Sequence, residues 1–246
     1  MGYSAAFMPP SCSVIQEAVL RRLAALGLAP ASSILDAPCG AGALTSALLA
    51  QGHDVLGADL APEAMAVLGE RFHPADLNGP LPWSDASFDV LCSVEGIEHL
   101  ESPFAFLREA RRVLKPGGIL VATTPNTVSL RSRVRFFGSG FYHRDPSPLN
   151  ESERHPLHHI GLRTFPELRY MLHTSGFRLR TVGHTHIKPV SFLYLGLAPW
   201  MAIYTLVAFR KEKDEAQRRR NRDVRRALFS RSLLLGENLL LEAVRE

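Results

Sequence analysis

Two carboxylates and a histidine follow one of the apolar segments of the chain, in the order Glu95-x-x-Glu98-His99. If this segment opens a helix, the i, i+3 and i+4 spacing puts all three side chains on one face. Such a set of ligands suits Mg²⁺, Mn²⁺ or a similar ion. A plainer interpretation stays open, because the helix dipole favours acidic residues in the first turn of any helix. A histidine there could also act as a general base without metal.

A second set of residues predicts a ligand site at the start of a helix. Residues 34–60 have the pattern of a strand, a glycine turn, a helix and a second strand, with Asp36 and Asp59 at the two strand ends. Gly40 and Gly42 let the backbone approach a ligand, and the free N–H groups of the helix face the crevice beyond the strands. Asp59 is placed to accept hydrogen bonds from a ribose diol. A dinucleotide stays an alternative, although Thr45 stands at the third glycine position of its fingerprint.

The continuation of the chain favours a different cofactor. With Asp36 and the segments HPADLNGPLPWSDASFDVLCSVEGIEHL (73–100) and FAFLREARRVLKPGGILVATTPN (104–126), the sequence resembles the class I S-adenosylmethionine-dependent methyltransferases from about residue 33 to residue 126. The resemblance implies S-adenosylmethionine as the cofactor. It implies these cofactor-binding residues: Asp36, Gly40 and Gly42 around the methionine part, Asp59 at the ribose, Asp76 and Leu77 beside the adenine, and Ser93.

The Glu-x-x-Glu-His motif is similar to that of two groups within this family, the small-RNA 2′-O-methyltransferases and the ubiquinone-pathway O-methyltransferases. In those enzymes a divalent metal holds two adjacent hydroxyls. In the small-RNA enzymes a further histidine precedes a Thr-x-x-Glu helix start, and His159 stands at that place before Thr164. The resemblance implies Glu98, His99 and His159 as catalytic residues and Glu95, Glu98, His99 and His159 as metal ligands. In a metal-free version, His99 or His159 is the general base.

The periodicity of apolar residues predicts an α/β fold. Strands are expected near 33–36, 54–58, 88–93, 118–123, 177–187 and 238–244, with a weak strand near 71–75, and helices near 14–26, 43–51, 62–71, 103–114 and 164–175. With the resemblance, this predicts one doubly wound, Rossmann-like domain over residues 1–246. Its seven-stranded sheet has an antiparallel last strand. Inserts at 127–160 and 188–235 are expected to form a cap over the acceptor.

Charge and hydropathy are unevenly distributed in the last third of the chain. Residues 191–209 contain no charge, and residues 210–226 carry nine Lys or Arg and four Asp or Glu. The apolar run is either a helix at a membrane surface or a helix packed on its own domain or a second copy. Because the remainder of the chain is close to neutral, a nucleic-acid partner is not favoured. Three cysteines in no metal or redox spacing indicate a reducing, cytoplasmic location.

These observations predict O-methylation of a hydroxyl on a glycan, lipid-linked or other small-molecule acceptor. An RNA 2′-hydroxyl is an alternative acceptor. A non-catalytic, cofactor-binding partner subunit is an alternative of another class, because the same residues would bind the cofactor in either case. The sequence leaves the acceptor and the oligomeric state open.

Overall fold

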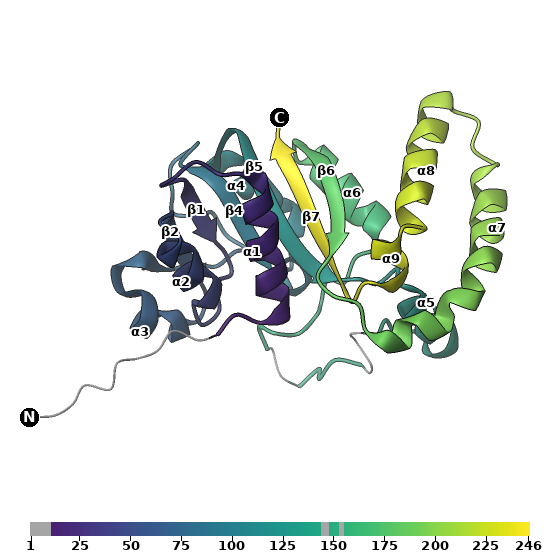
Figure 1. Ribbon diagram of the computed structural model, residues 1–246, viewed down its shortest axis with the longest axis horizontal. Coiled ribbons are helices and arrows are strands. Elements are labelled where there is room, and N and C mark those ends of the chain that lie inside the picture. The colour runs from purple at the N-terminus through teal and green to yellow at the C-terminus, as the bar shows by residue number, and fades with distance from the viewer. Residues whose placement is uncertain (1–10, 144–147, 153–154) are drawn as a thin grey trace, which may run out of the picture.

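A seven-stranded sheet in the order β3-β2-β1-β4-β5-β7-β6 forms the centre of the computed structural model (Figure 1). The structure describes residues 11–143, 148–152 and 155–246. The strands are β1 (Ser33–Asp36), β2 (Asp54–Asp59), β3 (Phe72–Pro74), β4 (Phe88–Val94), β5 (Leu114–Pro125), β6 (Phe177–His184) and β7 (Asn238–Arg245). Among these described strands, only β7 runs antiparallel to its neighbours, β5 and β6. This confirms the predicted doubly wound sheet with an antiparallel last strand.

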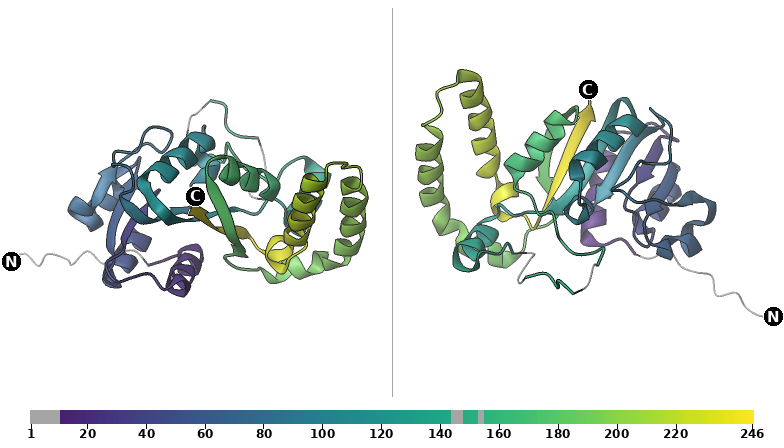
Figure 2. Two further views of the ribbon diagram at one scale, coloured as in Figure 1. Left: turned by 90° about the horizontal axis from the view of Figure 1, so that it is seen from above. Right: turned by 180° about the vertical axis from the view of Figure 1, so that it is seen from behind.

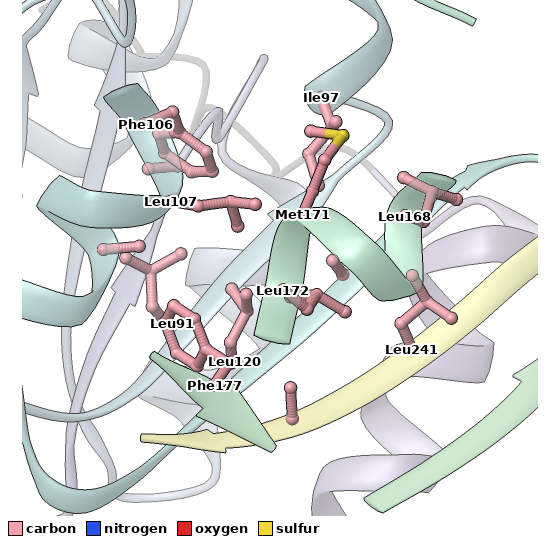
Figure 3. Close-up of a cluster of buried hydrophobic side chains, with 14 of the residues drawn as sticks. Leu91, Ile97, Phe106, Leu107, Leu120, Leu168, Met171, Leu172, Phe177 and Leu241 are labelled. Atoms are coloured by element: carbon pink, nitrogen blue, oxygen red, sulfur yellow. The ribbon is translucent and has the colours of Figure 1, made fainter. Parts of the chain in front are cut away.

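Helices cover both faces of the sheet (Figures 1 and 2). One face packs against α1 (Val14–Leu26) and α2 (Ala43–Ala50), and the other against α4 (Pro103–Val113) and α6 (Phe165–Thr174). Figure 3 shows the larger apolar cluster, in which α4 and α6 close over the sheet. Its labelled members are Leu91, Ile97, Phe106, Leu107, Leu120, Leu168, Met171, Leu172, Phe177 and Leu241.

Capping residues fix the ends of the helices. Ser13 and Gln16 form a reciprocal capping box at the start of α1, and Gly27 ends this helix in the left-handed region at φ 63°. The predicted helix 62–71 is mostly not α-helical. It consists of a 3₁₀ turn (Pro62–Ala64), the short α3 (Met65–Leu68) and a second 3₁₀ turn (Gly69–Arg71), because Gly69 leaves the helical region at φ 54°.

The two inserts occupy different places. The first follows β5 and contains α5 (Leu130–Ser139). The second contains the 3₁₀ helix η4 (Pro189–Leu197) and the helices α7 (Ala198–Phe209), α8 (Glu215–Leu228) and α9 (Arg231–Leu235). Helices α7 and α8 project from the body of the domain as a pair, at the right of Figure 1. The chain then returns to the sheet as β7, at the place that the sequence analysis predicted for the last strand.

Candidate functional site

A cavity with a volume of about 850 Å³ opens at one edge of the sheet. Its wall contains the turns that follow β1, β2 and β4 at the carboxyl ends of these strands, together with parts of the first insert. This is the edge at which doubly wound sheets bind ligands. The volume is sufficient for a ligand the size of S-adenosylmethionine with room beside it.

Asp36 presents a buried carboxylate to the floor of this cavity. Its side chain is 1% exposed, and Oδ2 accepts a hydrogen bond of 2.7 Å from Thr45 Oγ1 on α2. The second oxygen, Oδ1, is buried without a hydrogen-bond partner among the described residues. Burial raises the pKa of Asp36 to about 7, against the lowering effect of the Thr45 hydrogen bond. A buried carboxylate with one unused oxygen fits a cationic ligand such as a sulfonium cofactor.

The glycine turn and Asp59 form the adjacent wall. Gly40 has φ 52°, and its N–H donates to Asp59 Oδ2 over 2.8 Å. A Cβ added at Gly40 would meet no protein atom within 4 Å, whereas one at Gly42 would lie 3.0 Å from Leu68. Gly40 therefore leaves space for a ligand, and Gly42 is needed for packing against α3. Gly40 lines the cavity and Gly42 does not.

Two of the three remaining residues predicted to bind the cofactor, Asp76 and Leu77 but not Ser93, line the cavity. Asp76 and Leu77 both line the cavity, and Asp76 Oδ1 accepts from the backbone N–H of Asn78. Asn78 in turn accepts through Oδ1 from the N–H of Glu101, which joins this loop to the turn after β4. Ser93 does not line the cavity. It is fully buried in β4, under Gly96, where an added Cβ would lie 3.0 Å from Ser93 Oγ.

The turn after β4 is not the helix that the sequence predicted. Glu95 has φ 50°, outside any helix, and only Ile97–His99 form a 3₁₀ turn. The Glu95 carboxylate accepts from Thr123 Oγ1 at 3.0 Å and from Asn238 Nδ2 at 2.6 Å. Glu95 therefore does not share one face with Glu98 and His99. Its carboxylate ties the turn to strands β5 and β7.

Glu98, His99 and His159 are brought together. Each offers a ligand atom, and these three atoms lie within 4.8 Å of one another. Glu98 is fully buried and accepts from Thr124 Oγ1 at 3.0 Å, and the rings of His99 and His159 lie 4.9 Å apart. Because Thr123 and Thr124 are successive residues of one strand, they point to opposite faces of the sheet. This alternation separates the Glu95 carboxylate from the Glu98 carboxylate.

His99 is the member of this cluster that lines the cavity. Its Nδ1 lies 3.0 Å from the backbone carbonyl oxygen of His158. A carbonyl oxygen only accepts, so Nδ1 carries the proton and Nε2 keeps its lone pair. Burial lowers the pKa of His99, which favours this neutral form. A neutral imidazole of this kind can bind a cation or take up a proton.

The two inserts contribute unequally to the site. Residues 149–151, 155–158 and Ile160 of the first insert line the cavity, but no residue of 188–235, all of which the structure describes, does so. Sequence reasoning did not identify Gln16, Leu60, Asn78 or Leu100 as lining residues. Gln16 lies in the first turn of α1 and the other three lie in loops, and no motif in the sequence assigns any of them to a ligand site.

Comparisons with known proteins find relatives among the methyltransferases. The methyltransferase domain family matches residues 35–122. A protein of Mycolicibacterium smegmatis named "probable S-adenosylmethionine-dependent methyltransferase" is 33% identical over 158 residues, which cover 62% of this chain and 55% of that protein. A ubiquinone biosynthesis O-methyltransferase of Cereibacter sphaeroides is 34% identical over 103 residues, 38% of this chain and 41% of that protein. The chain thus spans about half the length of the curated relatives it matches.

A solved structure supports the fold over nearly the whole chain. It is a SAM-dependent methyltransferase from Archaeoglobus fulgidus, with a TM-score of 0.56 and 16% identity, and the match covers 95% of each chain. At this identity the likeness concerns the fold alone.

Proposed function

We propose that this chain, which is similar to the class I S-adenosylmethionine-dependent methyltransferases, transfers the methyl group of this cofactor to a hydroxyl of a small acceptor. When bound, the cofactor supplies a methyl group that is already activated on a sulfonium. Asp36 would face its positive charge, and Asp59 would hold its ribose hydroxyls. The acceptor would occupy the part of the cavity near His99.

The cluster of Glu98, His99 and His159 is the observation that carries the choice of an oxygen acceptor. A hydroxyl is a poor nucleophile until its proton is removed or its pKa is lowered. The neutral Nε2 of His99 is available at the cavity wall for either role. The name of the Cereibacter sphaeroides relative supports an oxygen acceptor for this chain as well.

We further propose that the cluster binds a divalent cation. One carboxylate and two imidazoles suit Mn²⁺ and similar ions, and ligand atoms within 4.8 Å of one another are close enough to share one. Three protein ligands would leave coordination positions for two adjacent acceptor hydroxyls. Acceptors with a vicinal diol, on a glycan, an aromatic ring or a lipid-linked group, would suit such a site. Glu95 is not part of this proposal.

Turnover on diol probes tests the proposed function. Catechol and a methyl glycoside are incubated with S-adenosylmethionine, and formation of S-adenosylhomocysteine is measured with Mg²⁺, with Mn²⁺ and with a chelator. Turnover that stops with the chelator and returns with the metal is expected. Undiminished turnover with the chelator would refute the role of the metal and leave His99 as the base.

Direct metal binding gives a second readout. Calorimetric titration with Mn²⁺ is expected to show binding to the native chain and its loss in His159→Ala. His173→Ala is the matched control, because His173 is exposed on α6, outside the cluster. Binding of S-adenosylhomocysteine without turnover on any hydroxyl would favour the non-catalytic subunit instead.

A further inference from the structure

The second insert contains a helical hairpin, formed by α7 and α8, and no residue of this hairpin lines the cavity. Its base is anchored in an apolar cluster, where Tyr194, Ala198 and Met201 pack against Leu130 of α5 and Leu235 of α9. Beyond this base, α7 and α8 extend away from the sheet (Figures 1 and 2). In α7, which the structure describes over its whole length, no residue is buried. The hairpin is therefore held firmly at one end, and its outer surface is open.

The outer face of α7 is a continuous apolar stripe. Trp200, Ile203, Tyr204 and Val207 follow one another at i, i+3, i+4 and i+7, and each side chain is more than half exposed. The stripe continues onto η4 at Leu193, which is 82% exposed. Single exposed apolar residues are ordinary on soluble proteins, but a contiguous row marks an interaction surface. We call these five residues the hairpin stripe.

Basic charge is concentrated on the second helix of the hairpin, α8, which packs beside α7 (Figure 1). The nine Lys or Arg of residues 210–226 begin where α7 ends and continue along α8. Arg218, Arg222 and Arg226 recur every four residues and are all exposed, so they share one side of α8. An apolar face flanked by Arg is the composition of helices that lie at an anionic lipid surface. A second copy of this chain fits less well, because two stripes facing each other would bring two positive segments together.

We propose that the hairpin stripe docks on an anionic lipid bilayer. An 18-residue window within residues 189–209 has a mean hydropathy of 1.7, and this segment, η4 followed by α7, is long and apolar enough to cross a membrane. This segment does not lie free in lipid along its whole length, because Tyr194, Ala198 and Met201 pack against α5 and α9 of the domain. The chain also returns to the sheet as β7. The hairpin therefore lies in one interface, with the stacked rings of Trp200 and Tyr204 at headgroup depth.

Docking would also orient the candidate active site. Strand β6 runs parallel to β5, since both are antiparallel to β7. The hairpin follows the carboxyl end of β6, and so it leaves the sheet at the edge that holds the cavity. The η4 end of the hairpin lies at that edge, and α7 runs from there toward the opposite edge of the sheet (Figure 1). The docking itself does not depend on the proposed methyl transfer, because lipid binding is measured without turnover.

Vesicle flotation of the full chain tests the proposal. Vesicles of phosphatidylcholine alone are compared with vesicles containing phosphatidylglycerol, at low and high salt. The native chain is expected to float with the anionic vesicles at low salt and to lose most of this binding at high salt. Trp200→Glu with Ile203→Glu should abolish flotation. Arg218→Gln, Arg222→Gln and Arg226→Gln together should lower the partition coefficient tenfold or more.

The matched control is Met65→Glu with Tyr170→Glu, which adds the same charge at two exposed apolar residues away from the hairpin. This variant should float like the native chain. The chain has two tryptophans, so Trp83→Phe leaves Trp200 as the sole indole. Its fluorescence should shift to the blue when anionic vesicles are added. The proposal is overturned if the native chain does not bind the anionic vesicles, or if the stripe variant and the control variant float equally. It is also overturned if sedimentation shows that the native chain is a dimer and that the stripe variant is a monomer.

Discussion

Replacing Asp36 by asparagine should change how the stability of the protein depends on pH. The folded chain holds the Asp36 proton up to a pKa of about 7, because the ionised carboxylate is buried. The unfolded chain releases this proton near pH 4. Between these values unfolding releases a proton, so each rise in pH lowers the free energy of unfolding. Above about pH 7 the loss is complete and the curve becomes flat.

The size of the effect follows from the two pKa values. The difference between a pKa of about 7 and the ordinary value of 3.8 corresponds to about 4 kcal/mol in all. Between about pH 5 and about pH 8, the free energy of unfolding of the native chain should fall by roughly 2 to 3 kcal/mol. The asparagine of the Asp36→Asn variant would keep the Thr45 hydrogen bond through its amide oxygen and has no charge to bury. In a chain of this length, the difference in melting temperature between Asp36→Asn and the native chain should change by about 5 to 10 °C between these two pH values.

Thermal melts of both chains without cofactor, at several pH values from about 5 to 8, measure this divergence. Asp223→Asn is the control, because it removes an exposed carboxylate from α8. As the pH rises, the melting temperature of Asp36→Asn should increase relative to that of the native chain, and the melting temperature of the control should not. A constant difference between native and Asp36→Asn melts at all pH values would show that Asp36 is ionised in the folded chain throughout, against the reasoning from its burial.

Three further predictions concern other parts of the molecule. Asp59→Asn should weaken binding of S-adenosylhomocysteine about 10- to 100-fold in calorimetry, because hydrogen bonds to a charged acceptor are worth about 1.5 to 3 kcal/mol; an unchanged affinity would remove Asp59 from the ribose site. Glu95→Gln should lower the free energy of unfolding by about 1 to 3 kcal/mol and leave Mn²⁺ binding intact, whereas Glu98→Gln should abolish Mn²⁺ binding. Phe106→Ala should cost about 3 to 5 kcal/mol in denaturant unfolding, because this ring is fully buried between α4 and the sheet, and a smaller loss would mean that the core can collapse around it.

The elements of the sheet could be predicted because local signals decide them. The helix 14–26 matches α1 at both ends, since Ser13 and Gly27 supply its two caps within the sequence itself. The short strand β3 was weakly predicted near 71–75 and lies at Phe72–Pro74. The helix predicted over 62–71 was largely wrong, since Gly69, with its positive φ of 54°, ends α3 early. The neighbouring residues provide no reason to prefer that conformation of Gly69 over a helical one.

The candidate site was less predictable than the fold. Asp36, Asp59 and Asp76 line the cavity, because each lies at or just after the carboxyl end of a parallel strand and the fold brings those ends together. Ser93 does not line it, since it lies within β4 and its side chain is directed under Gly96. The sequence pattern therefore indicated correctly where each of these residues lies along its strand. The direction of a side chain near the strand end depends on the twist and register of the sheet, and the local sequence pattern does not reveal these.

The turn after β4 shows most clearly why residue types near each other in sequence can separate in space. A helix would have put Glu95 and Glu98 on one face, but the bonds that decide their positions are made with Thr123 and Thr124, distant in sequence and adjacent in β5. Neighbouring residues of a strand face opposite ways, so each threonine draws one carboxylate to its own side of the sheet. The register of β4 against β5 therefore decides that Glu98 joins the histidines and that Glu95 holds the turn to the sheet. A variant with Thr124→Val would remove the hydroxyl that donates to Glu98 and leave the one that donates to Glu95, so it should weaken Mn²⁺ binding more than Thr123→Val does.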